Sequence, residues 1–352
     1  MPDSAIRYAA LPLQVTCQAV NRCKDIGEAR ARIMSAIAHC DELVLGSRQF
    51  VATFSGDTVR LVVLPEYFLT GFPMGESVPE WQEKACIREN GPEYEALGRL
   101  AQKHGVYLSG NAYEIDKNFP ELYFQTSFII SDAGNVILRY RRLISMFAPT
   151  PHDVLDSYLD IYGPNGLFPV VETELGRLAC VASEEILYPE IARAHALRGA
   201  EVICHSSSEI GSPQATPKNI AKQARAYENM VYVVSANSAG ITDNPIPNQS
   251  TDGHSQVVDY RGKVLAEAGQ GETMDGYAEV NISALRRTRA KSSMTNTLAR
   301  LRMGVFRNAY DIEPVYPKNT LMSAGVVKTP GRDHYLATQQ AVIDSLIERG
   351  II

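Results

Sequence analysis

Three polar side chains directly follow segments that should be buried, and their types could carry out acyl chemistry. Ser183 follows the apolar run 178–182, Glu66 follows the run 61–64, and Arg142 ends a hydrophobic hairpin. A serine hydroxyl is a weak nucleophile until a base takes its proton, and a buried carboxylate can act as that base. A guanidinium keeps its charge at any relevant pH and can stabilise an oxyanion. These residue types suit a serine-dependent acyl-transfer site.

The segment around Ser183 predicts a strand that turns sharply into the connection to a helix. Residues 178–182 are expected to form a short buried strand. Residues 189–198 are expected to form a helix, with Pro189 in its first turn, where proline is favoured. Open α/β sheets build their sites at the carboxyl ends of strands. Ser183 should therefore present its hydroxyl at such an edge.

Glu66 and Arg142 are predicted to pair with each other. The apolar run 59–64 stops at Pro65, so Glu66 projects from the end of a buried strand. Arg142 closes a hairpin in which strands 122–131 and 135–143 meet across residues 132–134. Burial of an unpaired charge is costly, and an ion pair between the two side chains would relieve that cost.

The rest of the chain alternates apolar strands with amphipathic helices. A helix is expected over 26–39, another over 93–104 and a third over 220–229, with a second hairpin over 255–268. The shape of the pocket depends on the loops 72–83 and 147–166, and the wider segment 145–164 should contain a helical piece. We expect one domain over 1–300 and a C-terminal arm over 301–352, whose apolar residues would pack on the core or clasp a neighbour. Those residues are Met303, Val305, Phe306, Tyr310 and Val315.

The sequence resembles the nitrilase superfamily of carbon–nitrogen hydrolases from about residue 6 to about residue 287. Residues 64–71, Leu-Pro-Glu-Tyr-Phe-Leu-Thr-Gly, resemble the family's glutamate motif. Tyr140-Arg141-Arg142 falls where the family has Tyr-Arg-Lys, and residues 176–190 resemble the segment around its nucleophile. Later matches are Arg193, residues 199–201 and 225–229, Asn237, Gly253-His254-Ser255 and Gly262.

This resemblance implies an α/β fold, a four-layer α-β-β-α sandwich that usually pairs with a second subunit. It also implies a Glu-Lys-Cys catalytic set, in which a cysteine attacks an amide or nitrile carbon. In this chain the cysteine position falls on Ser183 and the lysine position on Arg142. Cys180 lies three residues too early, so it should point to the opposite face of the strand and belong to the core.

The resemblance predicts an enzyme, an amidase-like hydrolase of non-peptide C–N bonds, with Ser183 as nucleophile, Glu66 as base and Arg142 as oxyanion support. Two alternatives remain open. One is an amide-forming acyltransferase, and the other is a non-catalytic relative that binds a ligand or partner. Replacement of a natural cysteine by serine is a further alternative, but the independent change at Arg142 argues against it.

Four further residues are expected around the substrate. The backbone N–H of Glu184 would be an oxyanion donor, as the resemblance implies. Tyr67, His205 and Glu209 would line the pocket, although an aromatic beside a strand end, such as Tyr67, more often serves packing, and a structural hydrogen-bonding role is equally open for His205.

Composition narrows the class of protein and its location. The chain has 352 residues and a formal net charge of -6, without the clustered basic face that binds nucleic acid. No segment approaches the length needed to cross a membrane. The six cysteines show no paired spacing, which is typical of reduced thiols in a cytoplasmic protein. Neither a metal nor another cofactor is implied. We therefore expect a cytoplasmic protein, and the resemblance to the nitrilase superfamily implies a homodimer or larger homo-oligomer that acts on a small amide.

Overall fold

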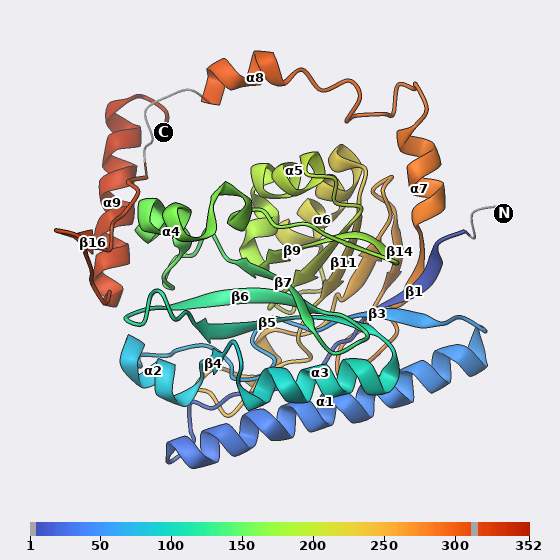
Figure 1. Ribbon diagram of the computed structural model, residues 1–352, viewed down its shortest axis with the longest axis horizontal. Helices are drawn as coiled ribbons and strands as arrows, with labels where there is room; N and C mark the ends of the chain where they lie inside the picture. The colour runs from blue at the N-terminus through green and yellow to red at the C-terminus, as the bar shows by residue number, and fades with distance from the viewer. Residues whose placement is uncertain (1–4, 311–315) are drawn as a thin grey trace.

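Two β-sheets pack face to face, and helices cover their outer faces (Figure 1). This computed structural model describes residues 5–310 and 316–352. The first sheet has the order β15-β1-β3-β5-β6-β7, with β4 paired to β5. Its strands are β15 Ala278–Asn281, β1 Arg7–Pro12, β3 Val59–Val63, β5 Tyr107–Ile115, β6 Tyr123–Ile130, β7 Val136–Arg141 and β4 Ile87–Arg88. The layers form the predicted four-layer α-β-β-α sandwich.

The second sheet carries the strand that leads to Ser183. Its order is β14-β13-β11-β10-β9-β8, and β9, β10 and β11 run parallel. These three strands are apolar almost throughout, because sheet and helix cover both of their faces. The strands are β14 Val264–Glu267, β13 Gln256–Val258, β11 Tyr232–Ala236, β10 Val202–Ser206, β9 Gly176–Ala182 and β8 Val171–Thr173.

Helices α1 Ile26–Phe54 and α3 Pro92–His104 lie on the first sheet. The prediction that α1 ends near residue 39 was wrong. Its apolar face continues through Cys40, Val44 and Val51, all of which are buried. Because one buried face persists for four more turns, packing on the sheet extends the helix.

Helices α5 Pro189–Leu197 and α6 Pro217–Asn229 lie on the second sheet. Helix α6 begins three residues earlier than predicted. The Thr216 hydroxyl accepts a hydrogen bond from the Asn219 N–H at 3.3 Å and so caps the helix. Pro217 then occupies the first turn, where its fixed φ suits a helix start.

The remaining elements are short or lie at the periphery. Both predicted hairpins are confirmed, as β6 with β7 and as β13 with β14. The loop segment 145–164 contains the turn Pro151–Val154 and α4 Leu155–Tyr162, as expected. The other elements are β2 Cys17–Gln18, α2 Val78–Lys84, β12 Ile241–Thr242, α7 Ile282–Arg289, α8 Met303–Tyr310, β16 Met322–Ser323, β17 Val326–Val327 and α9 Arg332–Glu348.

The C-terminal residues pack partly on the rest of the chain. Leu321 is buried in a cluster with Phe119, Phe124 and Tyr158, and the guanidinium of Arg332 in α9 lies over the Phe147 ring. Val315, named above as an apolar residue of the arm, lies outside the described residues. The division into a domain and an arm at residue 300 stays a prediction. None of the helices in the described ranges is long and apolar enough to span a lipid bilayer.

Candidate active site

Ser183 stands at the carboxyl end of β9 in a left-handed backbone conformation. Its φ is 49°, and a short 3₁₀ turn, Ser183–Leu187, leads from it towards α5. A non-glycine residue with such a φ is held there at a cost of about 1–3 kcal/mol, and such strain clusters at functional sites. A sharp strand-to-helix turn of this kind exposes a nucleophile at a sheet edge. The Ser183 side chain lies at the predicted position.

His205 of β10 holds the backbone of Ser183. Its Nε2 lies 2.8 Å from the Ser183 carbonyl oxygen, and its Nδ1 lies 2.9 Å from the Ser235 hydroxyl. Burial lowers the pKa of His205 well below its usual value, so the ring is neutral. A carbonyl can only accept, so Nε2 carries the proton and Nδ1 accepts from Ser235. Both nitrogens are occupied by protein groups, which favours the structural reading of His205 over substrate contact.

Glu66 is buried and pairs with Arg142, as the cost of burial predicted. Arg142 Nη1 lies 3.4 Å from Glu66 Oε1. Gln125 of β6 joins them, because its Nε2 donates to Glu66 Oε1 at 2.6 Å and its Oε1 accepts from Arg142 Nη1 at 2.6 Å. Glu66 Oε2 is buried and has no hydrogen-bond partner within residues 5–310 and 316–352. One oxygen of this carboxylate is thus held in place, and the other is free to accept a proton.

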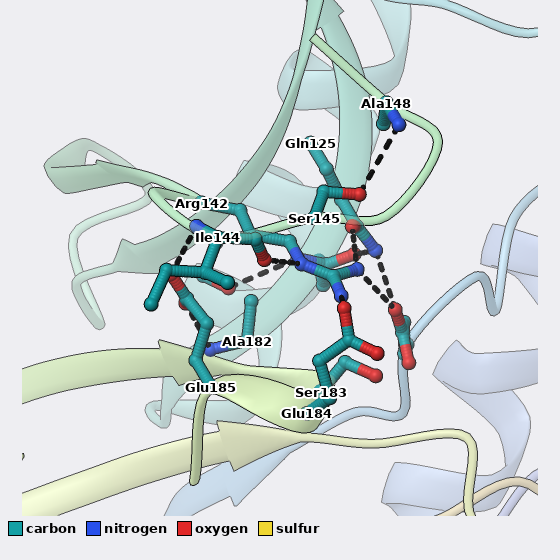
Figure 2. A network of polar contacts seen from close by, with 12 residues as sticks. Gln125, Arg142, Ile144, Ser145, Ala148, Ala182, Ser183, Glu184 and Glu185 are labelled. Atoms are coloured by element: carbon teal, nitrogen blue, oxygen red, sulfur yellow. Dashed lines mark hydrogen bonds and ion pairs between the residues drawn. The ribbon is translucent and has the colours of Figure 1, made fainter. Parts of the chain in front are cut away.

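Arg142 is engaged through all three of its nitrogens (Figure 2). Besides Nη1, its Nε donates to the Ile144 carbonyl at 2.7 Å, and its Nη2 pairs with the Glu184 carboxylate. Burial alone would lower the pKa of Arg142, but Tyr67, Glu66 and Glu184 outweigh it and raise that pKa above the usual value. Arg142 is a permanent cation that connects Glu66 to the residue after Ser183.

Two hydrogen bonds tie the chain around Glu66 to the end of β10, which lies beside the end of β9. The Glu66 N–H donates to the Ser207 carbonyl at 3.2 Å, and the Ser206 hydroxyl donates to the Leu64 carbonyl at 2.8 Å. Ser206 in turn lies opposite Ala182 in the parallel register of β10 and β9. The ends of β3, β10 and β9 therefore meet. No direct hydrogen bond between Ser183 and Glu66 is present among the described residues.

Glu185 fixes the opposite wall of the site, a role that the sequence did not single out. Its side chain is fully buried, and its Oε1 accepts from the Tyr140 hydroxyl at 2.8 Å and from the Leu143 N–H at 2.7 Å. Burial raises the pKa of Glu185 to about 7, although Arg142 and these donors lower it. Glu184 instead has a 37% exposed side chain. Of the two acids, Glu184 reaches the site and Glu185 anchors the end of β7.

Tyr67 and Glu209 lie at the edges of this arrangement. Tyr67 has a φ of 61°, and its ring stacks on Tyr113 with centroids 5.7 Å apart, so packing accounts for much of its position. Burial, reinforced by Glu66, raises the pKa of the Tyr67 phenol. Glu209 is buried, and its Oε1 accepts from the Ile210 N–H at 2.9 Å. Glu209 Oε2 has no hydrogen-bond partner in the part of the chain that the structure describes, which leaves it available to a ligand donor.

The family description of carbon-nitrogen hydrolases matches residues 16–290, more than three-quarters of the chain. The chain belongs to the carbon-nitrogen hydrolase family. The resemblance to the nitrilase superfamily and the prediction of a carbon–nitrogen hydrolase enzyme are thereby confirmed.

Two curated relatives and one solved structure illustrate the range of similarity. Omega-amidase NIT3 of Saccharomyces cerevisiae is 27% identical over 237 residues, which cover 67% of this chain and 79% of that protein. The 2-oxoglutaramate amidase of Bacillus subtilis is 29% identical over 212 residues, which cover 60% of this chain and 74% of that protein. A carbon-nitrogen hydrolase from Helicobacter pylori G27 superimposes with a TM-score of 0.65 at 20% identity, covering 88% and 99% of the two chains. That last likeness shows the shared fold.

Within this carbon-nitrogen hydrolase, Cys180 is a core residue, as predicted. It has no exposed surface, and its Sγ lies 3.7 Å from the Ser109 hydroxyl. Burial raises the pKa of the Cys180 thiol well above its usual value, so thiolate formation is disfavoured. The described residues contain no group of three or more His, Cys, Asp or Glu side chains placed to hold a metal ion.

Two lysines of α6 were missed at the sequence level. The Lys218 ammonium donates to Ser183 Oγ at 3.4 Å. Lys222 is fully buried, and its ammonium donates to Asn219 Oδ1 at 3.0 Å. Burial lowers the pKa of Lys222 to about 8. Their four-residue spacing near the start of a helix was a usable signal, because it places both on one face.

Proposed function

We propose that this chain is a serine-dependent amidase that cleaves the C–N bond of a small amide. Ser183 is the nucleophile, Glu66 is the base, and Arg142 holds Glu66 and Glu184 in position. One observation carries the proposal. The Arg142 guanidinium joins Glu66, whose Oε2 has no partner among the described residues, to Glu184, the residue that follows Ser183 on its strained backbone.

The proposed acylation step uses these groups in sequence. The Ser183 hydroxyl attacks the amide carbon, and its proton passes to Glu66 Oε2 as the new C–O bond forms. The carbonyl electrons move onto oxygen, where the Glu184 backbone N–H is the proposed oxyanion donor. The C–N bond then breaks and the amine leaves with the proton from Glu66. Water releases the acid from the Ser183 ester by the same steps.

The identity of the relatives guides the choice of substrate. Proteins named omega-amidase and 2-oxoglutaramate amidase make short amides with a remote carboxylate the first class to test. The unpaired oxygen of Glu209 adds an acceptor that would suit the donor N–H of an amide. We therefore expect primary amides of small acids to be better substrates than nitriles, because serine lacks the sulfur chemistry that favours nitrile attack.

Ammonia release tests the proposal directly. The protein is incubated with acetamide, butyramide, succinamate and glutaramate, and free ammonia is measured. We expect release from at least one of them, and loss of at least about 10³-fold in Ser183→Ala, as for other nucleophile deletions. Cys180→Ala is the matched control and should keep its activity. If Ser183→Ala turns over as fast as the native protein, the proposal is wrong.

We also propose that copies of the chain pair through α5 and α8. A cavity of about 870 Å³ lies between these helices, bounded by residues such as Pro189, Leu197 and Phe306. Val305 and Tyr310 of α8 expose about two-thirds of their surface, and exposed apolar patches mark interaction surfaces. Light scattering should give a dimer or larger, and a monomer would contradict this. The six cysteines are free and buried, which fits the proposed cytoplasmic location.

A further inference from the structure

Lys218 places an ammonium group at the proposed nucleophile. It is the second residue of α6, whose start is fixed by the Thr216 cap and by Pro217. Its Nζ donates to Ser183 Oγ at 3.4 Å. Within residues 5–310 and 316–352, Lys218 forms no ion pair with a carboxylate. Its charge is therefore not neutralised by a direct protein partner.

The two cations near Ser183 differ in how many of their hydrogen-bond donors remain unused. Arg142 donates from all three nitrogens to Ile144, Gln125, Glu66 and Glu184, so a new oxyanion would have to displace one of these acceptors. Lys218 has three donor hydrogens, and its contact in the site is the Ser183 hydroxyl. An ammonium also reorients easily, because its donors turn freely about the Cε–Nζ bond.

Lys222, one helical turn further on, is held differently. Its ammonium is fully buried and donates to Asn219 Oδ1 and, at 3.4 Å, to the His254 carbonyl. Those partners belong to α6 and to the loop before β13. Lys222 thus makes structural hydrogen bonds, whereas Lys218 points at the Ser183 hydroxyl oxygen.

We infer that Lys218 is a catalytic residue whose ammonium stabilises the negative charge that develops as Ser183 attacks. The inference rests on the proposed serine amidase function and assigns to Lys218 the main oxyanion role predicted for Arg142. In the free enzyme, Lys218 donates to Ser183 Oγ, which leaves the hydroxyl proton free to point to Glu66. During attack this proton moves to Glu66. Lys218 stays protonated and donates a hydrogen bond to the carbonyl oxygen as that oxygen gains the electron pair.

A burst experiment with an uncharged probe tests this role. p-Nitrophenyl acetate is mixed rapidly with the native protein and with three variants, and nitrophenolate release is followed. We expect Lys218→Met to slow acylation by about 10²–10³-fold, as for loss of one oxyanion donor. Lys218→Arg keeps the charge and should recover at least about a tenth of the native rate. Lys263→Met removes an exposed lysine of the β13–β14 hairpin and should match the native protein.

Comparison of the two Lys218 variants gives a second readout that a structural role would not move. Lys218→Arg should recover acylation while Lys218→Met does not, because a guanidinium also supplies a permanent positive charge and N–H donors. Thermal melting of each variant shows that the fold is intact.

Each outcome separates this inference from the proposed function. If the native protein and Lys218→Met acylate equally fast, Lys218 is not catalytic, while Ser183 can still be the nucleophile. If the native protein gives no burst and no ammonia from amides, both ideas fail. If Lys218→Met loses activity on succinamate but not on acetamide or p-nitrophenyl acetate, Lys218 binds a substrate carboxylate and the inference is overturned.

Discussion

Arg141 and Arg142 are adjacent on the chain, yet they sit in two buried charge clusters that differ in whether every carboxylate oxygen has a partner. Arg141 pairs with Asp116 at 2.6 Å and with Glu114 at 3.8 Å, and its guanidinium lies 4.4 Å from the centre of the Tyr162 ring. Arg142 pairs with Glu66 and Glu184. Successive residues of a strand point to opposite faces, so the two clusters are separated by the sheet.

The Arg141 cluster is saturated on its acidic side. Glu114 Oε2 accepts from the Tyr94 hydroxyl at 2.7 Å and pairs with Arg139, and its Oε1 faces Arg141. Asp116 Oδ2 accepts from the Tyr162 hydroxyl at 2.6 Å, and its Oδ1 accepts from a backbone N–H. The Arg142 cluster instead leaves Glu66 Oε2 without a hydrogen-bond partner among the described residues.

Buried charge by itself does not distinguish the two clusters. Both clusters unite arginine with carboxylates, and both satisfy the requirement that buried charges be paired. Only one combines an unsatisfied carboxylate oxygen with a serine on left-handed backbone and a lysine donor. We therefore expect an unpaired carboxylate oxygen beside a strained serine, and not buried charge alone, to mark the active site.

The largest contrast should come from the two glutamates. Glu66→Gln removes the proposed base and should lower amide turnover by about 10²–10⁴-fold. Glu114→Gln, in the saturated cluster, should reduce stability but leave the turnover of folded protein within a few-fold of native. Steady-state ammonia release at a temperature well below both melting points measures this. Similar losses of turnover in Glu66→Gln and Glu114→Gln would show that the two clusters do not differ in function.

The two arginines should have equal effects on stability and unequal effects on activity. Arg141→Met and Arg142→Met each leave a buried carboxylate without its cation, at a cost of about 3–5 kcal/mol in the free energy of unfolding. Only Arg142→Met should also abolish turnover, since Glu66 loses its positioning. Denaturant unfolding and ammonia release are measured side by side. Full activity in Arg142→Met would show that the Arg142 cluster is structural as well.

The pH dependence of stability should report on Glu185, which adjoins the Arg142 cluster. Its folded-state pKa is about 7, above the ordinary value of 4.5, so between these values the unfolded chain has lost a proton that the folded protein still holds. The contribution of Glu185 to the free energy of unfolding is thus fully present below pH 4.5. It is lost as pH rises through 7, by up to about 3 kcal/mol.

Glu185→Gln should remove this decline. Urea unfolding at pH 5, 6, 7 and 8 measures it, and Glu172→Gln at an exposed position of β8 controls for the loss of one charge. The decrease of the unfolding free energy with pH seen in the native protein should persist in Glu172→Gln and become smaller in Glu185→Gln. An unchanged slope in Glu185→Gln would remove Glu185 as its source.

Local signals predicted much of this molecule. The β6–β7 hairpin followed from two apolar runs across residues 132–134, and the pairing of Glu66 with Arg142 followed from the cost of burying either alone. The length of α1 and the short helix α2 within the predicted loop 72–83 were missed, because packing on the sheet extends one and a Ser77–Glu80 capping box starts the other.

The contacts that complete the site could not be read from the sequence. Lys218 meets Ser183 across 35 residues, through the docking of α6 on the turn after β9. Glu185 meets Tyr140 across 45 residues and joins the two sheets. Such contacts depend on how layers pack, which neither periodicity nor turn chemistry specifies.

Peptide mapping of the acyl-enzyme would identify the nucleophile directly. The protein is mixed with p-nitrophenyl acetate, quenched in acid within the burst and digested, and the acetylated peptide is identified by mass spectrometry. We predict one acetyl group, carried as an ester on Ser183, which is absent from Ser183→Ala and slow to form in Glu66→Gln. Acetylation of Cys180, or an adduct that survives in Ser183→Ala, would contradict the account.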